Sequence, residues 1–165
     1  MIPGVFDYLA PRSVDEAVAA LARGGDDAKI LAGGQSLIPA MRFRLASPTL
    51  LIDINRLSGL EYLRHDSGGL AIGALTREHA LERDGALAER YPLLHDAAQV
   101  IADPLVRNRA TVGGNIAHAD PANDHPAVML AYGAEVLAQG PRGARTIAID
   151  DFFLGLFETA LAHDE

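Results

Sequence analysis

The chain opens with a helical pattern of apolar residues. Ser13 and Glu16 form a capping box, in which the hydroxyl and the carboxylate accept hydrogen bonds from amides that the first helical turn leaves free. Alanine, leucine and valine then recur at helical spacing as far as a pair of glycines. This pattern predicts a helix over Val14–Arg23.

Two short apolar runs follow, and both are typical of buried strands. The first, Lys29–Ala32, is stopped by Gly33 and Gly34, after which Ser36–Arg44 resumes a helical pattern. The second run, Leu50–Ile54, comes after this helix. We expect the two strands to be parallel, because a crossover helix returns the chain to the same end of a sheet.

The remainder of the chain has a different hydrophobic pattern. Leu60–Arg64 and Leu70–Ala74 flank a turn-rich spacer, which predicts an antiparallel hairpin. Tyr91–Ala102 has helical periodicity, whereas Ala134–Ala138 and Arg145–Ile149 are typical of strands separated by a glycine-rich turn. This stretch is therefore expected to combine helices with antiparallel strands.

These patterns predict an α+β fold with two lobes. Residues 1–56 are expected to form a small α/β lobe with parallel strands, and residues 57–165 a larger α+β lobe with antiparallel strands. Neither lobe contains a repeat, a heptad array or a low-complexity segment. The sequence stops at Glu165 without an evident end signal, so we expect it to be a fragment.

Composition limits the chemistry that the 165 residues can carry. The absence of cysteine excludes disulfides, thiolate zinc sites and iron–sulfur clusters held by this chain's own thiolates. The formal net charge of -8 opposes binding to nucleic acid, whose phosphates attract a basic surface. No apolar run approaches the roughly 20 residues of a membrane-spanning helix, and no secretory signal begins the chain, so a cytoplasmic location is expected.

The segment Ala32-Gly33-Gly34-Gln35-Ser36 is the first candidate binding site, where a predicted strand ends and a predicted helix begins. Glycines there let consecutive backbone amides converge on an anion, and the helix N-terminus adds partial positive charge. This chemistry suits a diphosphate. The alternative is that the glycines simply form a turn, which is their commonest role between elements.

The segment Thr111-Val112-Gly113-Gly114-Asn115 is the second candidate. It offers amides from two glycines, together with a hydroxyl and a carboxamide. A polar loop then leads to an apolar helix over Asp124–Tyr132. Asp124 is expected to accept hydrogen bonds from the hydroxyls of a ribityl or ribose group. Alternatively Asp124 caps the helix, and the two roles are compatible.

Neither segment matches a common nucleotide motif, because the chain contains no Gly-x-Gly-x-x-Gly and no Gly-Lys-Ser or Gly-Lys-Thr. In order and spacing they are similar to the paired FAD motifs of the flavoprotein subunits of molybdenum hydroxylases, the family of carbon monoxide dehydrogenase and xanthine dehydrogenase. The resemblance covers essentially the whole chain. It includes Phe6-Asp7-Tyr8, Leu51-Ile52-Asp53-Ile54, Ile72-Gly73-Ala74-Leu75-Thr76 and Asp151-Phe152-Phe153.

The resemblance implies a p-cresol methylhydroxylase-type FAD-binding fold in an oxidoreductase subunit that has no catalytic residue or metal of its own. FAD would receive electrons from the 2Fe–2S clusters of a small partner subunit and pass them to an external acceptor. A molybdopterin-binding large subunit would bind the substrate. The family's smaller C-terminal domain is missing from these residues.

The resemblance also implies which residues contact the cofactor. They are Lys29, Ile30, Leu31, Ala32, Gly33, Gly34, Gln35, Ser36, Thr111, Val112, Gly113, Gly114, Asn115, Asp124 and Leu161. Many relatives carry histidine at the position of Gln35. This chain therefore keeps a polar side chain there but lacks a titratable one.

Three other interpretations were compared with the flavoprotein subunit. His118, Asp120, Asp124 and His125 are ligand types that suit zinc or iron, but the two histidines are not four residues apart on one helix, and turn and cap chemistry accounts for the aspartates. A stand-alone FAD-dependent reductase of the same superfamily would need a site for a large nucleotide-sugar, of which the sequence shows no sign. A flavin-free nucleotide-binding or interaction module would be colourless when purified.

Overall fold

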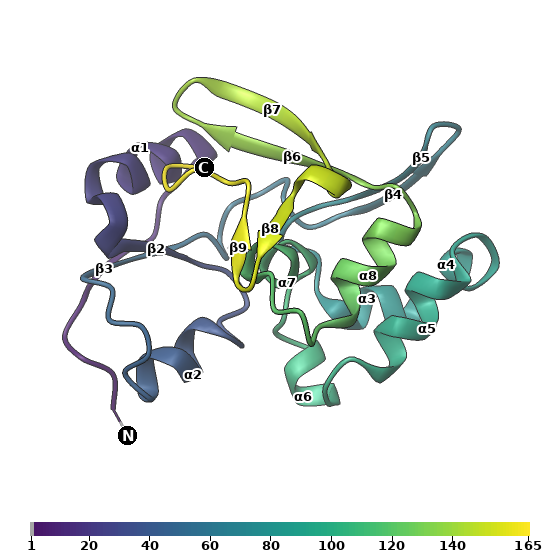
Figure 1. Cartoon of the computed structure of the whole chain (residues 1–165), viewed down its shortest axis with the longest axis horizontal. Helices are drawn as coiled ribbons and strands as arrows, with labels where there is room; N and C mark the ends of the chain where they lie inside the picture. Colours follow the sequence, from purple (N-terminus) through teal and green to yellow (C-terminus); the bar gives the residue numbers. More distant parts are fainter. Residues whose placement is uncertain (1) are drawn as a thin grey trace. The chain divides into compact units, whose positions relative to one another are not determined.

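The structure, a computed structural model, describes residues 2–165 and combines helices with short strands (Figure 1). The chain divides into two compact units. The first contains the described residues up to Ser58 together with Leu137–Thr146 and Leu161–Glu165, and the second contains Gly59–Val136 and Ile147–Ala160. The prediction that helices and strands are mixed along the chain is confirmed.

A parallel sheet of three strands forms the centre of the first unit, in the order β1-β3-β2. The elements of residues 2–58 are β1 (Asp7–Leu9), α1 (Val14–Gly24), η1 (Gly25–Asp27), β2 (Ala28–Leu31), α2 (Leu37–Arg42) and β3 (Leu50–Asp53). Leu31 at the end of β2 lies opposite Asp53 at the end of β3. The predicted parallel pairing of these two strands is confirmed, and β1 adds an edge strand that the hydrophobic pattern did not predict.

Helix α1 begins with the predicted capping box. The Ser13 hydroxyl accepts a hydrogen bond from the Glu16 amide at 3.1 Å, and the Glu16 carboxylate accepts one from the Arg12 amide at 2.7 Å. The helix packs on β2 and β3 and buries Ala17, Ala20 and Leu21. Its predicted extent is confirmed to within one residue at the C-terminal end.

The second unit consists mainly of short helices. Its elements are β4 (Leu63–Asp66), β5 (Gly69–Ile72), α3 (Glu78–Arg83), α4 (Gly85–Arg90), α5 (Pro92–Val100), α6 (Pro104–Arg107), α7 (Val112–His118), α8 (Asp124–Ala131), η2 (Ile149–Asp151), β8 (Phe153–Gly155) and β9 (Glu158–Thr159). Helix α5 packs against α3, α4 and α8. The core of this unit includes the buried side chains of Leu81, Leu87, Leu94, Ala98 and Phe152.

Two antiparallel hairpins test the remaining strand predictions. β4 and β5 pair with Leu63 opposite Ile72 and Asp66 opposite Gly69, so the turn between them is shorter than the spacer expected from the sequence. β6 (Glu135–Gly140) and β7 (Gly143–Ala148) form a second two-stranded sheet. Both predicted pairs of strands are therefore confirmed, with shifted limits.

A cluster of charged hydrogen bonds joins Arg145 to Glu165, the last described residue, within the first unit. Arg145 Nη2 lies 2.6 Å from Glu165 Oε2, and Arg145 Nε donates to Glu165 Oε1 at 2.8 Å. The Ala162 amide donates to the same carboxylate at 2.9 Å. The Arg145 guanidinium, helped by this amide, lowers the pKa of Glu165 to about 2, against the opposing effect of burial.

This cluster makes the stability of the fold depend on pH at the acidic end. Because the folded-state pKa of Glu165 is lowered, its stabilising contribution is complete above the ordinary pKa of 4.5 and is lost as the pH falls towards about 2. We therefore expect Glu165→Gln to lower the free energy of unfolding at pH 6 more than at pH 3. Urea unfolding at the two pH values measures this, with Glu89→Gln, an exposed side chain, as the control. An equal loss at both pH values would contradict the assignment.

Candidate functional site

The first glycine loop, defined here as Gly33–Ser36, leads from β2 into α2. Gly34 has a φ angle of 73°, in the left-handed region that favours glycine. A Cβ atom on Gly34 would lie 2.8 Å from Cδ1 of Ile38 and 3.3 Å from Cδ1 of Leu31. Both the backbone conformation and the neighbouring side chains therefore favour glycine at this position.

The backbone amides of the first glycine loop are available to a ligand. Within residues 2–165, no group accepts a hydrogen bond from the amides of Gly33, Gly34, Gln35 or Ser36. None of these residues is fully buried. Free amides that follow one another can bind an anion together. Helix α2 has only six residues, so the amides rather than a long helix dipole carry this property.

The second glycine segment is folded into helix α7, with Thr111 as its N-cap. The Gly113 amide donates to the Ala74 carbonyl at 3.1 Å, and the Gly114 amide donates to the Thr111 hydroxyl at 3.2 Å. The expectation that these glycines present free amides to an anion is therefore wrong. Both amides are already used within the second unit, because the segment continues as a helix.

Gly113 permits close packing between α7 and the segment that precedes α3. A Cβ atom on Gly113 would lie 2.7 Å from the carbonyl oxygen and 2.8 Å from Cα of Ala74, which are backbone atoms. The neighbouring Val112 amide donates to the Thr76 carbonyl at 2.9 Å. The first turn of α7 is thus held by backbone hydrogen bonds that a larger residue at position 113 would disrupt.

Asn115 presents the side-chain atom of α7 that best suits a ligand. Its Nδ2 lies 3.5 Å from Glu78 Oε1, a long hydrogen bond. Its Oδ1 is buried and accepts no hydrogen bond from the described residues. A buried polar atom without a partner lowers stability, unless a ligand or water supplies the missing bond. Oδ1 of Asn115 can therefore accept a hydrogen bond from a ligand hydroxyl.

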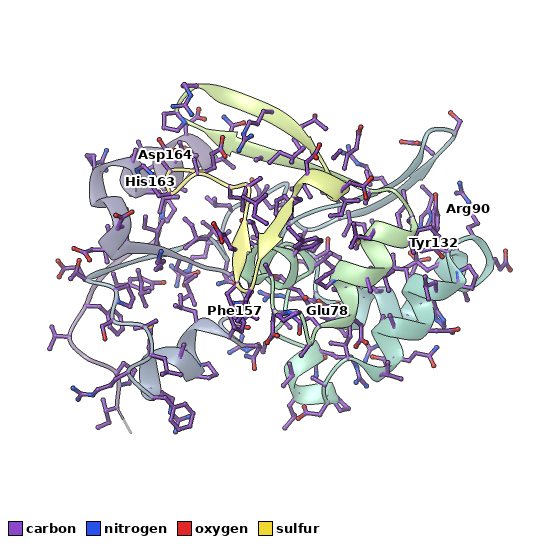
Figure 2. The ribbon with its side chains drawn as sticks, in the orientation of Figure 1. Glu78, Arg90, Tyr132, Phe157, His163 and Asp164 are labelled. Carbon is purple, nitrogen blue, oxygen red and sulfur yellow. The ribbon has the colours of Figure 1, made fainter. Side chains whose placement is uncertain are left out.

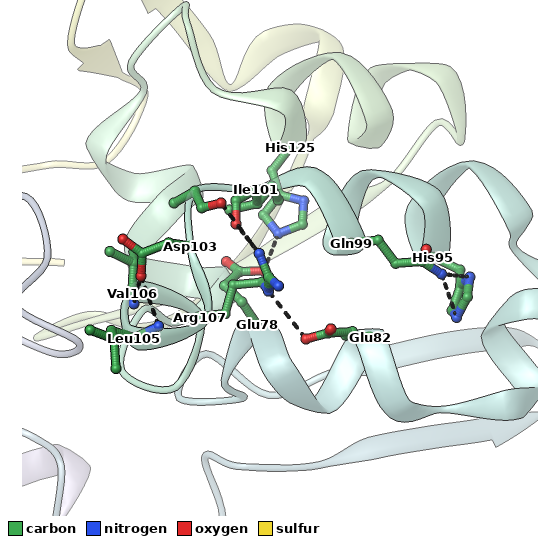
Figure 3. A network of polar contacts seen from close by, with 11 residues as sticks. Glu78, Glu82, His95, Gln99, Ile101, Asp103, Leu105, Val106, Arg107 and His125 are labelled. Atoms are coloured by element: carbon green, nitrogen blue, oxygen red, sulfur yellow. Dashed lines mark hydrogen bonds and ion pairs between the residues drawn. The ribbon is translucent and has the colours of Figure 1, made fainter.

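A buried pair of titratable side chains supports Asn115. His125 Nε2 lies 2.7 Å from Glu78 Oε2, and both side chains are fully buried (Figure 3). The pair links α3 to α8 and holds the Glu78 carboxylate beside Asn115. Loss of either partner would leave the other buried without this hydrogen bond, which is unfavourable.

Asp124 is the first residue of α8 and is exposed. Asn123 occupies the N-cap position, and its side chain makes no capping hydrogen bond. The alternative in which Asp124 is the cap is therefore wrong, and its carboxylate is free to accept hydrogen bonds from a ligand. Because α7 packs against α8, the segments that carry Asn115 and Asp124 lie together in the second unit.

The other predicted contact residues belong to the first unit. Lys29 is exposed on β2, whereas Ile30 and Leu31 on the same strand are half-buried. Leu161 is also half-buried. The structure thus groups Lys29–Ser36 with Leu161 in one unit, and Thr111–Asn115 with Asp124 in the other.

Three residues that hold the glycine segments are not identified by the sequence analysis. Asn55 donates from Nδ2 to the Ala32 carbonyl at 2.7 Å, and Ala74 and Glu78 contact α7 as described above. The position of Asn55 directly after a predicted strand is a usable signal, because polar groups at the carboxyl ends of parallel strands often shape binding loops. No comparable signal exists for Glu78, since its burial depends on how the helices pack.

Residues 2–165 contain no cluster of three metal-ligating side chains close enough to hold an ion. His125 is paired with Glu78, and the ring of His118 lies 5.1 Å from the ring of Phe157 in the β8–β9 turn. Figure 2 shows Glu78 and Phe157 in their places on the ribbon. The described helices are also all too short or too polar to cross a membrane.

Known sequences resemble this chain over its whole length. The family described as FAD binding domain in molybdopterin dehydrogenase matches residues 4–165. The chain is 51% identical over 165 residues to the carbon monoxide dehydrogenase medium chain of Hydrogenophaga pseudoflava, covering 100% of this chain and 58% of that one. It is 34% identical over 139 residues to the xanthine dehydrogenase FAD-binding subunit of Escherichia coli O157:H7, covering 84% and 48%. The chain thus spans little more than half the length of the curated relatives it matches.

Solved structures agree with these sequence matches. Carbon monoxide dehydrogenase from Hydrogenophaga pseudoflava superposes with a TM-score of 0.96 at 51% identity, covering 99% of this chain and 57% of that one. Quinoline 2-oxidoreductase from Pseudomonas putida 86 gives a TM-score of 0.94 at 35% identity, with the same coverage of 99% and 57%. The resemblance to molybdenum hydroxylase flavoprotein subunits is confirmed, and the chain belongs to the family of FAD binding domains in molybdopterin dehydrogenases.

Proposed function

We propose that this chain is the FAD-binding part of the flavoprotein subunit of a molybdenum-containing hydroxylase. In the assembled enzyme, a molybdopterin-binding large subunit oxidises the substrate, and the 2Fe–2S clusters of a small subunit deliver the electrons to FAD. An external acceptor then takes them. Family membership and the names of the relatives support this role.

The observation that carries the proposal is the row of free amides at Gly33–Ser36. Amide donors to a charged acceptor form stronger hydrogen bonds than neutral pairs do, and a pyrophosphate offers several charged oxygens to them. The first glycine loop is therefore assigned to the pyrophosphate of FAD. Lys29, Ile30, Leu31 and Ala32, which lead into the loop, and Leu161 are assigned to further contacts.

The second glycine segment binds through side chains. Oδ1 of Asn115 and the exposed carboxylate of Asp124 are acceptors for the ribityl or ribose hydroxyls of the cofactor. Thr111, Val112, Gly113 and Gly114 form the first turn of α7 and hold Asn115 in position. This assignment keeps the predicted contact segment but replaces free amides with an amide side chain and a carboxylate.

The proposal includes a p-cresol methylhydroxylase-type fold with lobes of residues 1–56 and 57–165. The parallel sheet within the first unit and the antiparallel hairpin β4–β5 within the second support it. FAD supplies the redox chemistry when bound, and the role of the protein is to hold and orient it. The cytoplasmic location expected from the sequence stays a prediction.

The electron-transfer role predicts that this chain does not oxidise a substrate by itself. Without cysteine, it binds no iron–sulfur cluster through its own thiolates, so electrons reach FAD from another subunit. Purified chain loaded with FAD should keep its oxidised flavin spectrum during anaerobic incubation with aldehydes, purines or carbon monoxide. Bleaching of the flavin by any of these without partner subunits would contradict the proposal.

Gly34→Ala should weaken FAD binding. Alanine would be strained at the φ angle of 73°, and relief of that strain would shift the backbone that carries the free amides. Gly25→Ala is the control, since Gly25 also has a positive φ angle of 57° but lies outside the loop, with no atom within 4 Å of an added Cβ. Each substitution should lower stability through backbone strain, by about 1–3 kcal/mol. Only Gly34→Ala should raise the Kd for FAD in a fluorescence titration, and an unchanged Kd would oppose the assignment of the loop.

Asn115→Ala should separate cofactor binding from stability. Loss of the Oδ1 acceptor should raise the Kd for FAD about tenfold, the effect of one good hydrogen bond. The free energy of unfolding of the flavin-free chain should change little, because the substitution removes a buried acceptor that has no partner in residues 2–165 together with the long hydrogen bond to Glu78. Flavin titration and urea unfolding measure the two effects. A destabilised variant with unchanged FAD affinity would show that Asn115 is only structural.

A further inference from the structure

A series of hydrogen bonds crosses the carboxyl end of the parallel sheet in the first unit. The Tyr8 hydroxyl on β1 donates to Asp53 Oδ2 at 2.6 Å. Asp53 Oδ1 accepts from the backbone amide of Asn55 at 2.9 Å and from its Nδ2 at 2.7 Å. The same Nδ2 donates to the Ala32 carbonyl at 2.7 Å. Asn55 thus connects the end of β3 to the residue just before the first glycine loop.

Asp53 is held as a strong acceptor for this series. Burial acts to raise the pKa of its carboxyl group, but the hydrogen bonds from Tyr8 and Asn55, with the nearby charge of Arg56, outweigh burial and lower the pKa. The same contact with Asp53 raises the pKa of Tyr8. Asp53 is therefore ionised and Tyr8 protonated at neutral pH, and the Asn55 amide is oriented by a charged acceptor.

The orientation of the Ala32 carbonyl determines where the next amide points. In a planar trans peptide, the carbonyl of one residue and the N–H of the next point in opposite directions. Because Asn55 holds the Ala32 carbonyl on its own side, the Gly33 N–H points away from Asn55. That amide is one of those without an acceptor in residues 2–165.

The following two peptides are held in the same manner but by other donors. Gln35 Nε2 donates to the Gly33 carbonyl at 3.3 Å, which directs the Gly34 amide away from that side chain. The Ile38 amide donates to the Gly34 carbonyl at 3.1 Å and thereby directs the Gln35 amide. Of these three bonds, the one from Asn55 is the shortest, and its donor lies two residues after β3, outside the loop and α2. It is therefore the bond that fixes the loop to the sheet.

We propose that Asn55 is a positioning residue for FAD, which turns the Gly33 amide of the first glycine loop towards the cofactor pyrophosphate without contacting the cofactor itself. This proposal rests on the proposed function of the loop. Asp53 orients the Asn55 side chain, and Tyr8 holds Asp53. The first glycine loop thus owes the direction of its first amide to a side chain outside both glycine segments.

Two substitutions at position 55 test this role, with one matched control. Asn55→Leu keeps a side chain of similar size but has no donor, and Asn55→Asp keeps the shape but also loses the donor to Ala32. Ser13→Ala is the control in the same unit. It removes the N-cap hydrogen bond of α1, which lowers stability without touching the loop.

The first measurement is the affinity for FAD, which is determined from the quenching of flavin fluorescence. Asn55→Leu and Asn55→Asp should each raise the Kd for FAD about tenfold or more, the effect of one or more lost hydrogen bonds to a charged group. Ser13→Ala should leave the Kd within about twofold of the wild-type value. This corresponds to a change of a few tenths of a kcal/mol in the free energy of binding. Wild-type affinity in both Asn55 variants would overturn the proposal.

The second measurement separates positioning from general damage to the fold. In ¹⁵N–¹H spectra of the wild-type chain, saturating FAD should shift the backbone amides of Gly33 and Gly34 and the side-chain amide of Asn115. At saturating FAD, Asn55→Leu should lose the shift at Gly33 and keep the shift at Asn115. Equal loss at all three positions would show a purely structural role and overturn the proposal. If Asn55→Leu does not fold, Asn55→Asp provides the same comparison.

The experiment also distinguishes failure of this inference from failure of the proposed function. If the wild-type chain itself shows no FAD binding, the proposed function is contradicted and the role of Asn55 falls with it. If the wild-type chain binds FAD and the variants at position 55 behave like it, only the role of Asn55 is rejected.

Discussion

The parallel pairing of β2 with β3 is the constraint on which the first glycine loop depends. Leu31 lies opposite Asp53, so the chain leaves both strands at the same edge of the sheet. Asn55, two residues after β3, therefore reaches the Ala32 carbonyl, one residue after β2. A shift of one residue in this register would move the carbonyl away from its donor and exchange the sheet faces on which Leu51 and Ile52 are buried. The register that buries the interior of β3 is thus the same register that holds the amides of the first glycine loop exposed.

The two double-glycine segments show that one sequence pattern can serve two physical purposes. In the first, the positive φ angle of Gly34 reverses the chain before a helix is established, and four amides have no acceptor among the residues that the structure describes. In the second, Thr111 caps α7 two residues before Gly113, so the amides of both glycines find partners and Gly113 serves close packing with Ala74. What distinguishes the two is where the helix begins. Helix α7 begins before its glycines, whereas α2 begins only after Gly33 and Gly34, with Ser36 at its N-cap position.

The sequence predicts the local elements of this structure but not the contacts between segments that are distant in the chain. The capping box at Ser13, strands β2 and β3 of the first unit and both hairpins follow from local patterns and are present, whereas β1 was not predicted. The family also followed from the motifs, because their order and spacing are sequence properties. The use of the glycine amides did not follow, since it depends on the Ala74 carbonyl, which approaches α7 only in the folded unit. The Glu78–His125 pair was missed for the same reason, as a buried partner 47 positions away leaves no local pattern.

The free amides of the first glycine loop, and the two carboxamides that orient them, are neutral groups. Backbone amides and the carboxamides of Gln35 and Asn55 do not titrate near neutral pH, so the free amides of the loop keep their number and orientation over that range. A histidine at position 35, as the resemblance implies for many relatives, would add a group whose charge changes near pH 6.5. With Gln35, the attraction of the loop for an anion comes from oriented amide dipoles, and no proton uptake by residue 35 can accompany a change in the charge of the cofactor. In this chain any coupling between flavin charge and protons at this loop must therefore involve a group other than the side chain at position 35.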